Sequence, residues 1–254
     1  MSLDPSPANA TEPSLLGLTL GGGGAFGAAH VGALQSLFER GIHPDVVTGT
    51  SSGALVGAAY AAGMDLKAIE KIALDFRWGR IARWTLSPRW GLLDSRPITA
   101  GITRLLGEDP PIERLPRRFG AVATDLRTRR AVTISRGPLS AALRATIAVP
   151  GLLPPVRIDG RLLADGGMVD NVPYRAARAL GANRLIVVRL HARWETVRMM
   201  RTVASTAELA SDPGVVLIQP EMERLAQWTM RDIPRLIDEG RRAADAALDA
   251  HARA

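Results

Sequence analysis

Residues 46–59 read Val46-Val47-Thr48-Gly49-Thr50-Ser51-Ser52-Gly53-Ala54-Leu55-Val56-Gly57-Ala58-Ala59. A β-branched run leads directly into the pattern Gly-x-Ser-x-Gly, and a run of small residues suited to a helix follows. This order of strand, tight turn and helix is the context that a nucleophile elbow requires. Gly49 and Gly53 allow a sharp turn with no side chain blocking Ser51, and the start of a helix favours a developing negative charge. The stretch therefore predicts Ser51 as a nucleophile, with an ordinary glycine-rich strand–helix turn as the alternative.

The composition indicates a globular chain without a nucleic-acid partner. At 254 residues and 46% hydrophobic content, the chain is long enough for one α/β domain with a sizeable core. Its net charge of +7 comes almost entirely from arginine, because Lys67 and Lys71 are the only lysines. A basic chain raises the question of nucleic acid or an anionic membrane surface. The arginines are scattered and no nucleic-acid motif accompanies them, so we expect no nucleic acid to bind.

Residues that bind metals or form disulfides are scarce. The sequence has no cysteine, and its four histidines, at positions 30, 43, 191 and 251, lack metal-ligand spacing. We therefore expect neither a metal nor another cofactor.

The segment 1–13 is polar and proline-containing, without the positive start of a secretory signal. We expect it to be a disordered N-terminal segment, and residues 14–254 to form a single domain, because no repeat, linker or break in composition divides them. No apolar run of about 18 residues or more occurs without glycine, so no transmembrane helix is expected. A cytoplasmic protein is the default expectation.

The glycine-rich stretch that precedes the elbow predicts an anion site. A short apolar strand, 14–20, leads into the loop 21–27, and a helical pattern with one apolar face follows over 28–40. With the strand at 46–48, this gives the βαβα start of a mostly parallel sheet. The spacing Gly22-x-Gly24-x-x-Gly27 also matches a dinucleotide fingerprint, but that fingerprint needs an acid at the end of the second strand. Asp45 precedes that strand, so we favour backbone N–H groups that bind an oxyanion.

The remaining pattern continues the alternation of helices and strands. A helix is expected from Asp65, and a hairpin around Asp159-Gly160 joins strands 156–158 and 161–163. Further helices are predicted at 97–106, at 139–147 and from 234 onward, and further strands at 119–124, 131–134, 184–190 and 215–218.

The segment 77–91 combines tryptophan with arginine. Trp78, Trp84 and Trp90 are interleaved with four arginines and broken by proline and glycine. Tryptophan and arginine together suit a boundary between water and lipid. A lid or lipid-facing segment that gives peripheral membrane association is one interpretation, and a surface excursion that covers the core is the other.

A serine nucleophile needs a base, and the sequence offers two arrangements. Asp165 stands beside Gly166 and Gly167, directly after a hairpin strand, where a tight turn and partial burial could raise its pKa and prepare it to accept a proton. A turn aspartate is the structural alternative. The order Ser51, Asp165, His191 also permits a triad, although only 25 residues separate the last two. His30 lies within the first helix and is expected to have a packing role.

Three motifs in this order resemble the patatin-like phospholipase family, in its bacterial single-domain form. They are the glycine loop 22–27, the elbow 49–53 and Asp165-Gly166-Gly167, and the resemblance extends from about residue 15 to about residue 247. Supporting segments are Ala123-Thr124-Asp125-Leu126, Ile147-Ala148-Val149-Pro150-Gly151 and Val169-Asp170-Asn171-Val172-Pro173. The sequence departs from the family at Phe26, where arginine or lysine is usual, and at Thr146, where serine is more usual.

The resemblance implies a three-layer α/β/α fold with a mostly parallel central sheet. It also implies a serine acyl hydrolase that cleaves lipid esters with a Ser51–Asp165 dyad and no histidine. The backbone of Gly22, Gly23 and Gly24, supplemented by the N–H of Ser52, is expected to form the oxyanion hole. The glycines that complete the motifs are Gly27, Gly49, Gly53, Gly166 and Gly167. A carboxylesterase or thioesterase with soluble substrates, or a regulatory protein with little turnover, remains the alternative.

Overall fold

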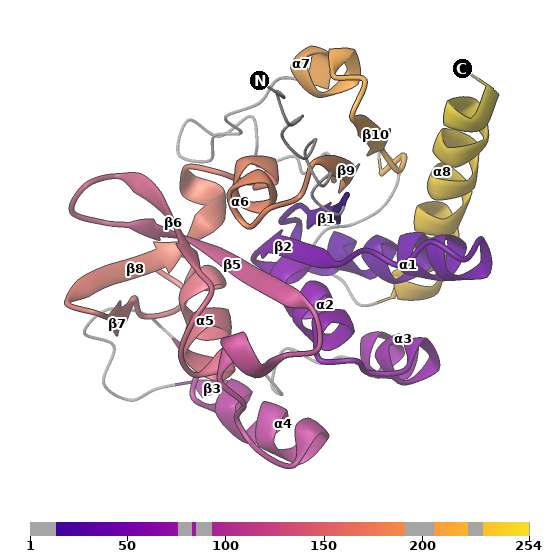
Figure 1. Ribbon diagram of the computed structural model, residues 1–254. Helices are drawn as coiled ribbons and strands as arrows, with labels where there is room; N and C mark the ends of the chain where they lie inside the picture. Colours follow the sequence, from indigo (N-terminus) through magenta and orange to yellow (C-terminus); the bar gives the residue numbers. More distant parts are fainter. Residues whose placement is uncertain (1–13, 76–82, 85–92, 191–205, 223–230, 254) are drawn as a thin grey trace, which may run out of the picture.

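The computed structural model describes residues 14–75, 83–84, 93–190, 206–222 and 231–253 (Figure 1). Residues 1–13, Trp78, Trp90 and His191 lie outside these ranges, and only the backbone of Trp84 is described. The expectations of a disordered N-terminal segment and of a lipid-facing tryptophan segment therefore concern residues outside the described part of the chain.

One mixed sheet of eight strands organises the molecule. The order is β10-β9-β1-β2-β5-β8-β7, with β6 on the other edge of β5. The neighbours from β10 to β5 are parallel, whereas β6 and β8 are antiparallel to β5, and β7 is antiparallel to β8. The strands are β1 (Leu16–Leu20), β2 (Val46–Thr50), β5 (Arg118–Asp125), β6 (Arg130–Ile134), β7 (Val156–Ile158), β8 (Arg161–Asp165), β9 (Arg184–Val188) and β10 (Val215–Ile218).

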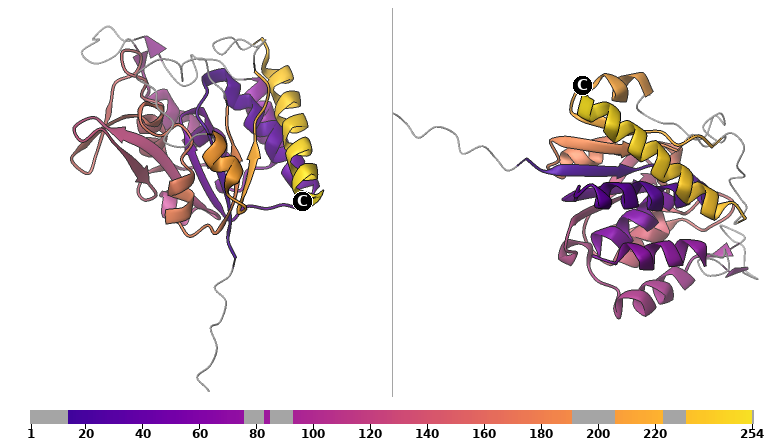
Figure 2. Two further views of the ribbon diagram at one scale, coloured as in Figure 1. Left: turned by 90° about the horizontal axis from the view of Figure 1, so that it is seen from above. Right: turned by 90° about the vertical axis from the view of Figure 1, so that its right-hand side faces the viewer.

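Helices cover both faces of this sheet. Successive strand residues point to opposite faces, and the core is accordingly divided in two. Val47, Ile186 and Val188 join a large cluster with α1 (Ala29–Glu39), α2 (Ser52–Ala61), α5 (Leu139–Thr146) and α8 (Ile233–Arg253). Val46 and Val187 join a smaller cluster with α6 (Tyr174–Ala179) and α7 (Thr206–Ser211). The two views of Figure 2 show the layers from above and from the side. The expected α/β/α architecture with a mostly parallel sheet is confirmed.

The interior strands β1 and β2 carry no charged residue because both faces of the sheet are buried there. β2 and the last four residues of β1 are buried throughout, as parallel strands covered on both sides usually are. Polar atoms inside this sheet pair with one another, since the hydroxyls of Thr19 and Thr48 lie 3.1 Å apart across β1 and β2. The first two strands thus form a rigid base for the turns that follow them.

The remaining elements mostly follow the predicted pattern. Asp65 caps the start of α3 (Leu66–Leu74) by accepting hydrogen bonds from the N–H groups of Lys67 and Ala68. α4 (Pro97–Leu106) and β10 have the predicted bounds. The other elements are β3 (Arg83–Trp84), β4 (Leu93–Asp94) and the short 3₁₀ helices η1 (Gly24–Ala28), η3 (Ile112–Arg114) and η4 (Gly166–Met168). Among the helices that the structure describes, none combines the length and apolar character needed to cross a membrane.

Candidate active site

Ser51 occupies the bend between β2 and α2 in a backbone conformation that L-residues rarely adopt. Its φ is 52° and its ψ is −121°, a combination that stores strain in a non-glycine residue. The N–H of Ser51 donates to the hydroxyl of Thr146 at 2.9 Å. A Cβ on Gly53 would lie 2.2 Å from the carbonyl oxygen of Leu20. The bend is therefore fixed by contacts on both sides, and the Ser51 side chain is 8% exposed.

The register of β5 explains why Ser51 and Asp165 lie close together. β2 runs parallel to β5 and ends with Thr50 opposite Val122. β8 pairs antiparallel with the next part of β5 and ends with Asp165 opposite Ala123. β2 and β8 thus lie end to end along the same edge of β5. Their ends lie opposite the consecutive residues Val122 and Ala123. Ser51 follows one end directly, and Asp165 is the last residue of the other.

The carboxyl group of Asp165 is buried and faces few polar groups. Its Oδ1 accepts a hydrogen bond from the N–H of Gly167 at 2.8 Å, and the residue is 3% exposed. Burial raises the pKa of Asp165 to about 6, although hydrogen bonds from the Gly167 N–H and the Ser51 hydroxyl act in the opposite direction. Oδ2 has no hydrogen bond of standard geometry from the described residues. The contact between the Ser51 hydroxyl and this carboxyl group therefore lies outside standard hydrogen-bond geometry.

The glycine loop presents its N–H groups unequally. The N–H of Gly22 donates to the carbonyl of Asn171 at 3.1 Å, so it is already occupied. This differs from the expectation that all three glycine N–H groups would be free for an oxyanion. The N–H of Gly23 donates to the Ser52 hydroxyl at 3.0 Å. Within the described part of the chain, the N–H groups of Gly24 and Ser52 donate to no acceptor.

Two residues support this site through long-range hydrogen bonds. The Nδ2 group of Asn171 donates to the carbonyl of Gly22 at 3.2 Å, so one residue holds both backbone groups of that glycine. Thr146 donates to the carbonyl of Val122 while it accepts from Ser51. In the sequence, Asn171 falls in a supporting segment and Thr146 marks a departure from the family, and neither could be given a role because their partners are distant along the chain.

Two of the described histidines, His30 and His43, contact neighbouring groups in the fold. His30 is fully buried, and its Nε2 donates to the carbonyl of Gly21 at 2.7 Å. Burial lowers the pKa of His30 to about 4, so its ring is neutral at neutral pH. His43 packs against Phe38 with ring centroids 5.1 Å apart. The expected packing role of His30 agrees with this environment.

Two further residues from the motifs, Asp170 and Phe26, are also buried. Asp170 is buried, which raises its pKa to about 6 despite the nearby charge of Arg175, and its carbonyl accepts from the Thr50 hydroxyl. Phe26, at the position where the family usually has a cation, is 1% exposed and belongs to the large core cluster. No group of three His, Asp or Glu side chains among the described residues is arranged to hold a metal ion.

The fold defines an α/β protein in which Ser51 occupies a strand–turn–helix bend. The sequence model of patatin-like phospholipases matches residues 18–178, so the chain belongs to the patatin-like phospholipase family. This confirms the resemblance drawn from the three motifs and assigns the chain to a family of hydrolases.

Relatives and solved structures agree with this assignment. An uncharacterised NTE family protein of Mycobacterium tuberculosis is 41% identical over 177 residues, which are 68% of this chain and 48% of that protein. The lysophospholipase nte1 of Emericella nidulans is 36% identical over 178 residues, which are 68% of this chain and 12% of that protein. The chain spans about half the length of the first mycobacterial relatives, 48% or 46%.

The fold is shared with two bacterial proteins of known structure. VipD from Legionella pneumophila superposes with a TM-score of 0.59 at 16% identity, over 94% of this chain and 67% of that one. The type III effector ExoU superposes with a TM-score of 0.52 at 16% identity, over 94% of this chain and 53% of that one. At this identity the likeness concerns the fold alone.

Proposed function

We propose that the chain is a serine acyl hydrolase that cleaves carboxylic ester bonds of lipids, with Ser51 as nucleophile and Asp165 as base. The observation that carries the proposal is the junction on β5, where the strained bend of Ser51 meets a buried carboxyl with a pKa of about 6. A base of that pKa is ionised at neutral pH and still accepts a proton readily. The family membership supports a lipid ester as substrate.

In the proposed reaction, the Ser51 hydroxyl attacks the ester carbonyl and transfers its proton to Asp165. The tetrahedral oxyanion is stabilised by the N–H groups of Gly24 and Ser52. The N–H of Gly23 joins them when it exchanges the Ser52 hydroxyl for the oxyanion. The alcohol leaves with the proton from Asp165, and an acyl group remains on Ser51. Water then attacks this acyl-enzyme with Asp165 again as base, which releases the carboxylic acid.

The role of Gly22 in this proposal is structural rather than electrostatic. Its N–H and carbonyl are both bonded to Asn171, which fixes the loop before substrate binds. Preorganised donors are effective because they need no rearrangement during the reaction.

The test is hydrolysis of phospholipid vesicles and of short-chain nitrophenyl esters by the wild type and by Ser51→Ala and Asp165→Asn. We expect both substitutions to reduce turnover by about 10²-fold or more, and His191→Ala to retain it. Hydrolysis of soluble esters alone would favour the carboxylesterase or thioesterase alternative. A folded wild type without turnover on either substrate would favour the regulatory alternative, and loss of turnover in folded His191→Ala would restore the triad.

We also propose peripheral association with lipid surfaces through Trp78, Trp84 and Trp90, on the basis of their sequence pattern with arginine. The variant Trp84→Ala is expected to weaken binding to vesicles more than it reduces turnover of a soluble ester. Equal losses in both assays would support a role in covering the core instead.

A further inference from the structure

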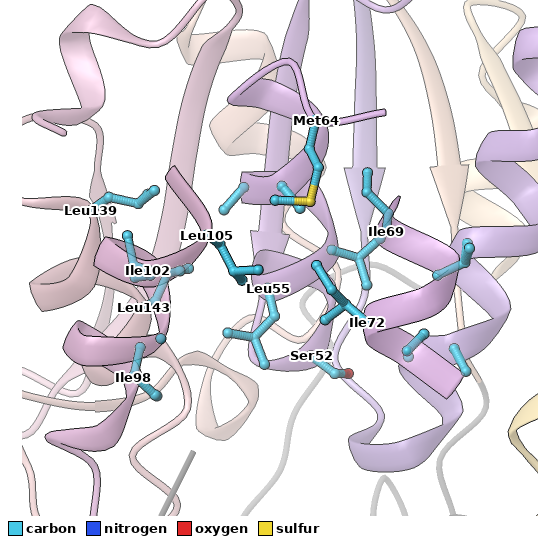
Figure 3. A pocket seen from close by; sticks show the side chains of 18 of the residues that line it. Ser52, Leu55, Met64, Ile69, Ile72, Ile98, Ile102, Leu105, Leu139 and Leu143 are labelled. Atoms are coloured by element: carbon cyan, nitrogen blue, oxygen red, sulfur yellow. The ribbon is translucent and has the colours of Figure 1, made fainter. Parts of the chain in front are cut away.

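An apolar cavity begins one residue after Ser51 and continues along the surface of α2. Its volume is about 490 Å³, within the range of pockets that bind small ligands. α2 contributes Ser52, Leu55, Val56 and Ala59, whose spacing places them on one face of the helix. The cavity is bordered by α3 on one side and by α4 and α5 on the other, as Figure 3 shows.

The two ends of this cavity differ in character. One end contains Ser52 and Gly24, whose N–H groups are proposed to donate hydrogen bonds to the oxyanion. The other end contains Met64, which follows the last turn of α2, and Ser52 and Met64 lie at opposite ends in Figure 3. The cavity therefore extends from Ser52, the residue that follows Ser51, toward Met64, although Ser51 and Asp165 themselves do not line it.

The lining is suited to a hydrocarbon chain. Most of the lining side chains are aliphatic, and Arg104 is the charged residue among them. A polar ligand would find few partners for its hydrogen bonds there and would lose the bonds it makes with water. Leu105 lines the cavity and is nevertheless 51% exposed, so the described residues leave part of the apolar lining uncovered.

The length of the cavity sets the length of the chain that fits. A helix rises about 1.5 Å per residue, so the path from Ser52 to Ala59 is about 10 Å. An extended alkyl chain with bonds of about 1.5 Å advances about 1.25 Å per carbon, so this path holds about eight carbons. The additional space as far as Met64 extends the fit to about twelve.

We propose that this cavity holds the acyl chain of the ester and that Gly101 on α4 determines the chain length accepted. This inference rests on the proposed function, because its first test measures ester hydrolysis. Gly101 lines the cavity, and a Cβ built on it would have no neighbour within 4 Å. It lies one helical turn from both Ile98 and Leu105, which also line the cavity. A side chain at position 101 would therefore start in open space, on a part of α4 that lines the cavity.

The catalytic test compares nitrophenyl esters with chains of about 2 to 16 carbons. We expect the wild type to prefer about 8 to 12 carbons, because each additional buried methylene favours the transition state by about fourfold. Gly101→Leu is expected to lower kcat/KM about 10-fold or more for these esters while it leaves the shortest esters within about twofold. Gly101→Ala should give an intermediate profile.

The matched control is Thr103→Leu, which adds a leucine to an exposed position of the same helix that does not line the cavity. Its chain-length profile should follow that of the wild type. Retained turnover of the shortest esters also shows that Gly101→Leu is folded. A Gly101→Leu profile that follows the wild type across all lengths would overturn the assignment of the cavity and leave the proposed hydrolase intact.

A binding measurement tests the cavity independently of turnover. In the Ser51→Ala protein, we expect decanoate to displace a fluorescent fatty acid, butyrate to displace it weakly, and the additional change Gly101→Leu to weaken decanoate about 10-fold or more. If the wild type hydrolyses no ester, the proposed function fails while this assay still reports on the cavity. Equal decanoate affinity with and without Gly101→Leu, or no decanoate binding at all, would overturn the inference.

Discussion

Replacement of Asp165 by asparagine should remove activity and stabilise the fold at the same time. The pKa of this buried carboxyl is about 6, against an ordinary value of 3.8. The charged form therefore costs about 3 kcal/mol of stability at pH 7.5, because each pKa unit corresponds to about 1.36 kcal/mol. An amide has nearly the shape of a protonated carboxyl and can still accept from the N–H of Gly167. We therefore expect Asp165→Asn to recover about 2 kcal/mol of this penalty at pH 7.5.

The sign of the pH dependence follows from linkage. The folded state holds the proton of Asp165 more tightly than the unfolded state, so the cost grows as pH rises from about 4 to about 6. At pH 5 the same pKa values give a cost of about 1.5 kcal/mol. The stability advantage of Asp165→Asn over wild type should thus be about 1.5 kcal/mol smaller at pH 5 than at pH 7.5.

Urea unfolding at pH 5 and pH 7.5 measures this difference, and thermal unfolding checks it. For a chain of this size, about 2 kcal/mol raises Tm by roughly 4–8 °C. Asp125→Asn is the matched control, because Asp125 is likewise the buried last residue of its strand, β5, but its pKa is lowered by the N–H groups of Arg127 and Thr128. That variant should be less stable than wild type at pH 7.5. An Asp165→Asn protein that is less stable than wild type at pH 7.5, or whose stability advantage does not change with pH, would refute the reasoning.

Three further substitutions test how the site is held. Thr146→Val should lower the free energy of unfolding by about 1–3 kcal/mol and reduce ester turnover, because it leaves the buried Ser51 N–H without an acceptor. Thr146→Ser should match wild type in both measurements. A Thr146→Val protein with wild-type stability and turnover would contradict this role. Asn171→Ala should reduce kcat about 10-fold with little change in KM, because it frees the carbonyl of Gly22; a change confined to KM in steady-state kinetics would argue against this positioning role. Ser51→Gly should be more stable than Ser51→Ala by about 1 kcal/mol in urea unfolding, because relief of strain outweighs the entropy of glycine; a less stable glycine variant would show that the bend is not strained.

The local parts of this structure could be predicted from the sequence. α4 is bounded by Pro97 at its first turn and by Gly107 in the left-handed conformation just after its end, and both are local signals for helix ends. The bend at Ser51 follows from the β-branched run before it and the glycines around it. The hairpin between β7 and β8 follows in the same way from Asp159-Gly160, both of which have positive φ.

The arrangement that brings the candidate site together is not local, and sequence patterns do not contain it. β8 extends to Asp165 rather than ending near residue 163 because its last residues pair with β5. Nothing in the sequence fixes that register. The partners Thr146 and Ser51 are 95 residues apart, and the carbonyl of Asn171 that occupies the Gly22 N–H comes from a loop far along the chain. The motifs predicted which residues form the candidate site. Long-range strand pairing and hydrogen bonds determine which of their backbone N–H groups are already bonded within the fold.

We propose that the Asp165 carboxylate activates the Ser51 hydroxyl, and the rate of covalent labelling by a fluorophosphonate measures this activation. We expect wild type to gain one phosphonyl group at Ser51, located by peptide mass mapping, with a rate that rises through a midpoint near pH 6. Above pH 6, Asp165→Asn should label about 10²-fold more slowly than wild type and show no midpoint near pH 6, while Asp170→Asn should keep the midpoint of the wild type. Labelling of folded Asp165→Asn at the wild-type rate, or labelling of the wild type at a residue other than Ser51, would contradict the account.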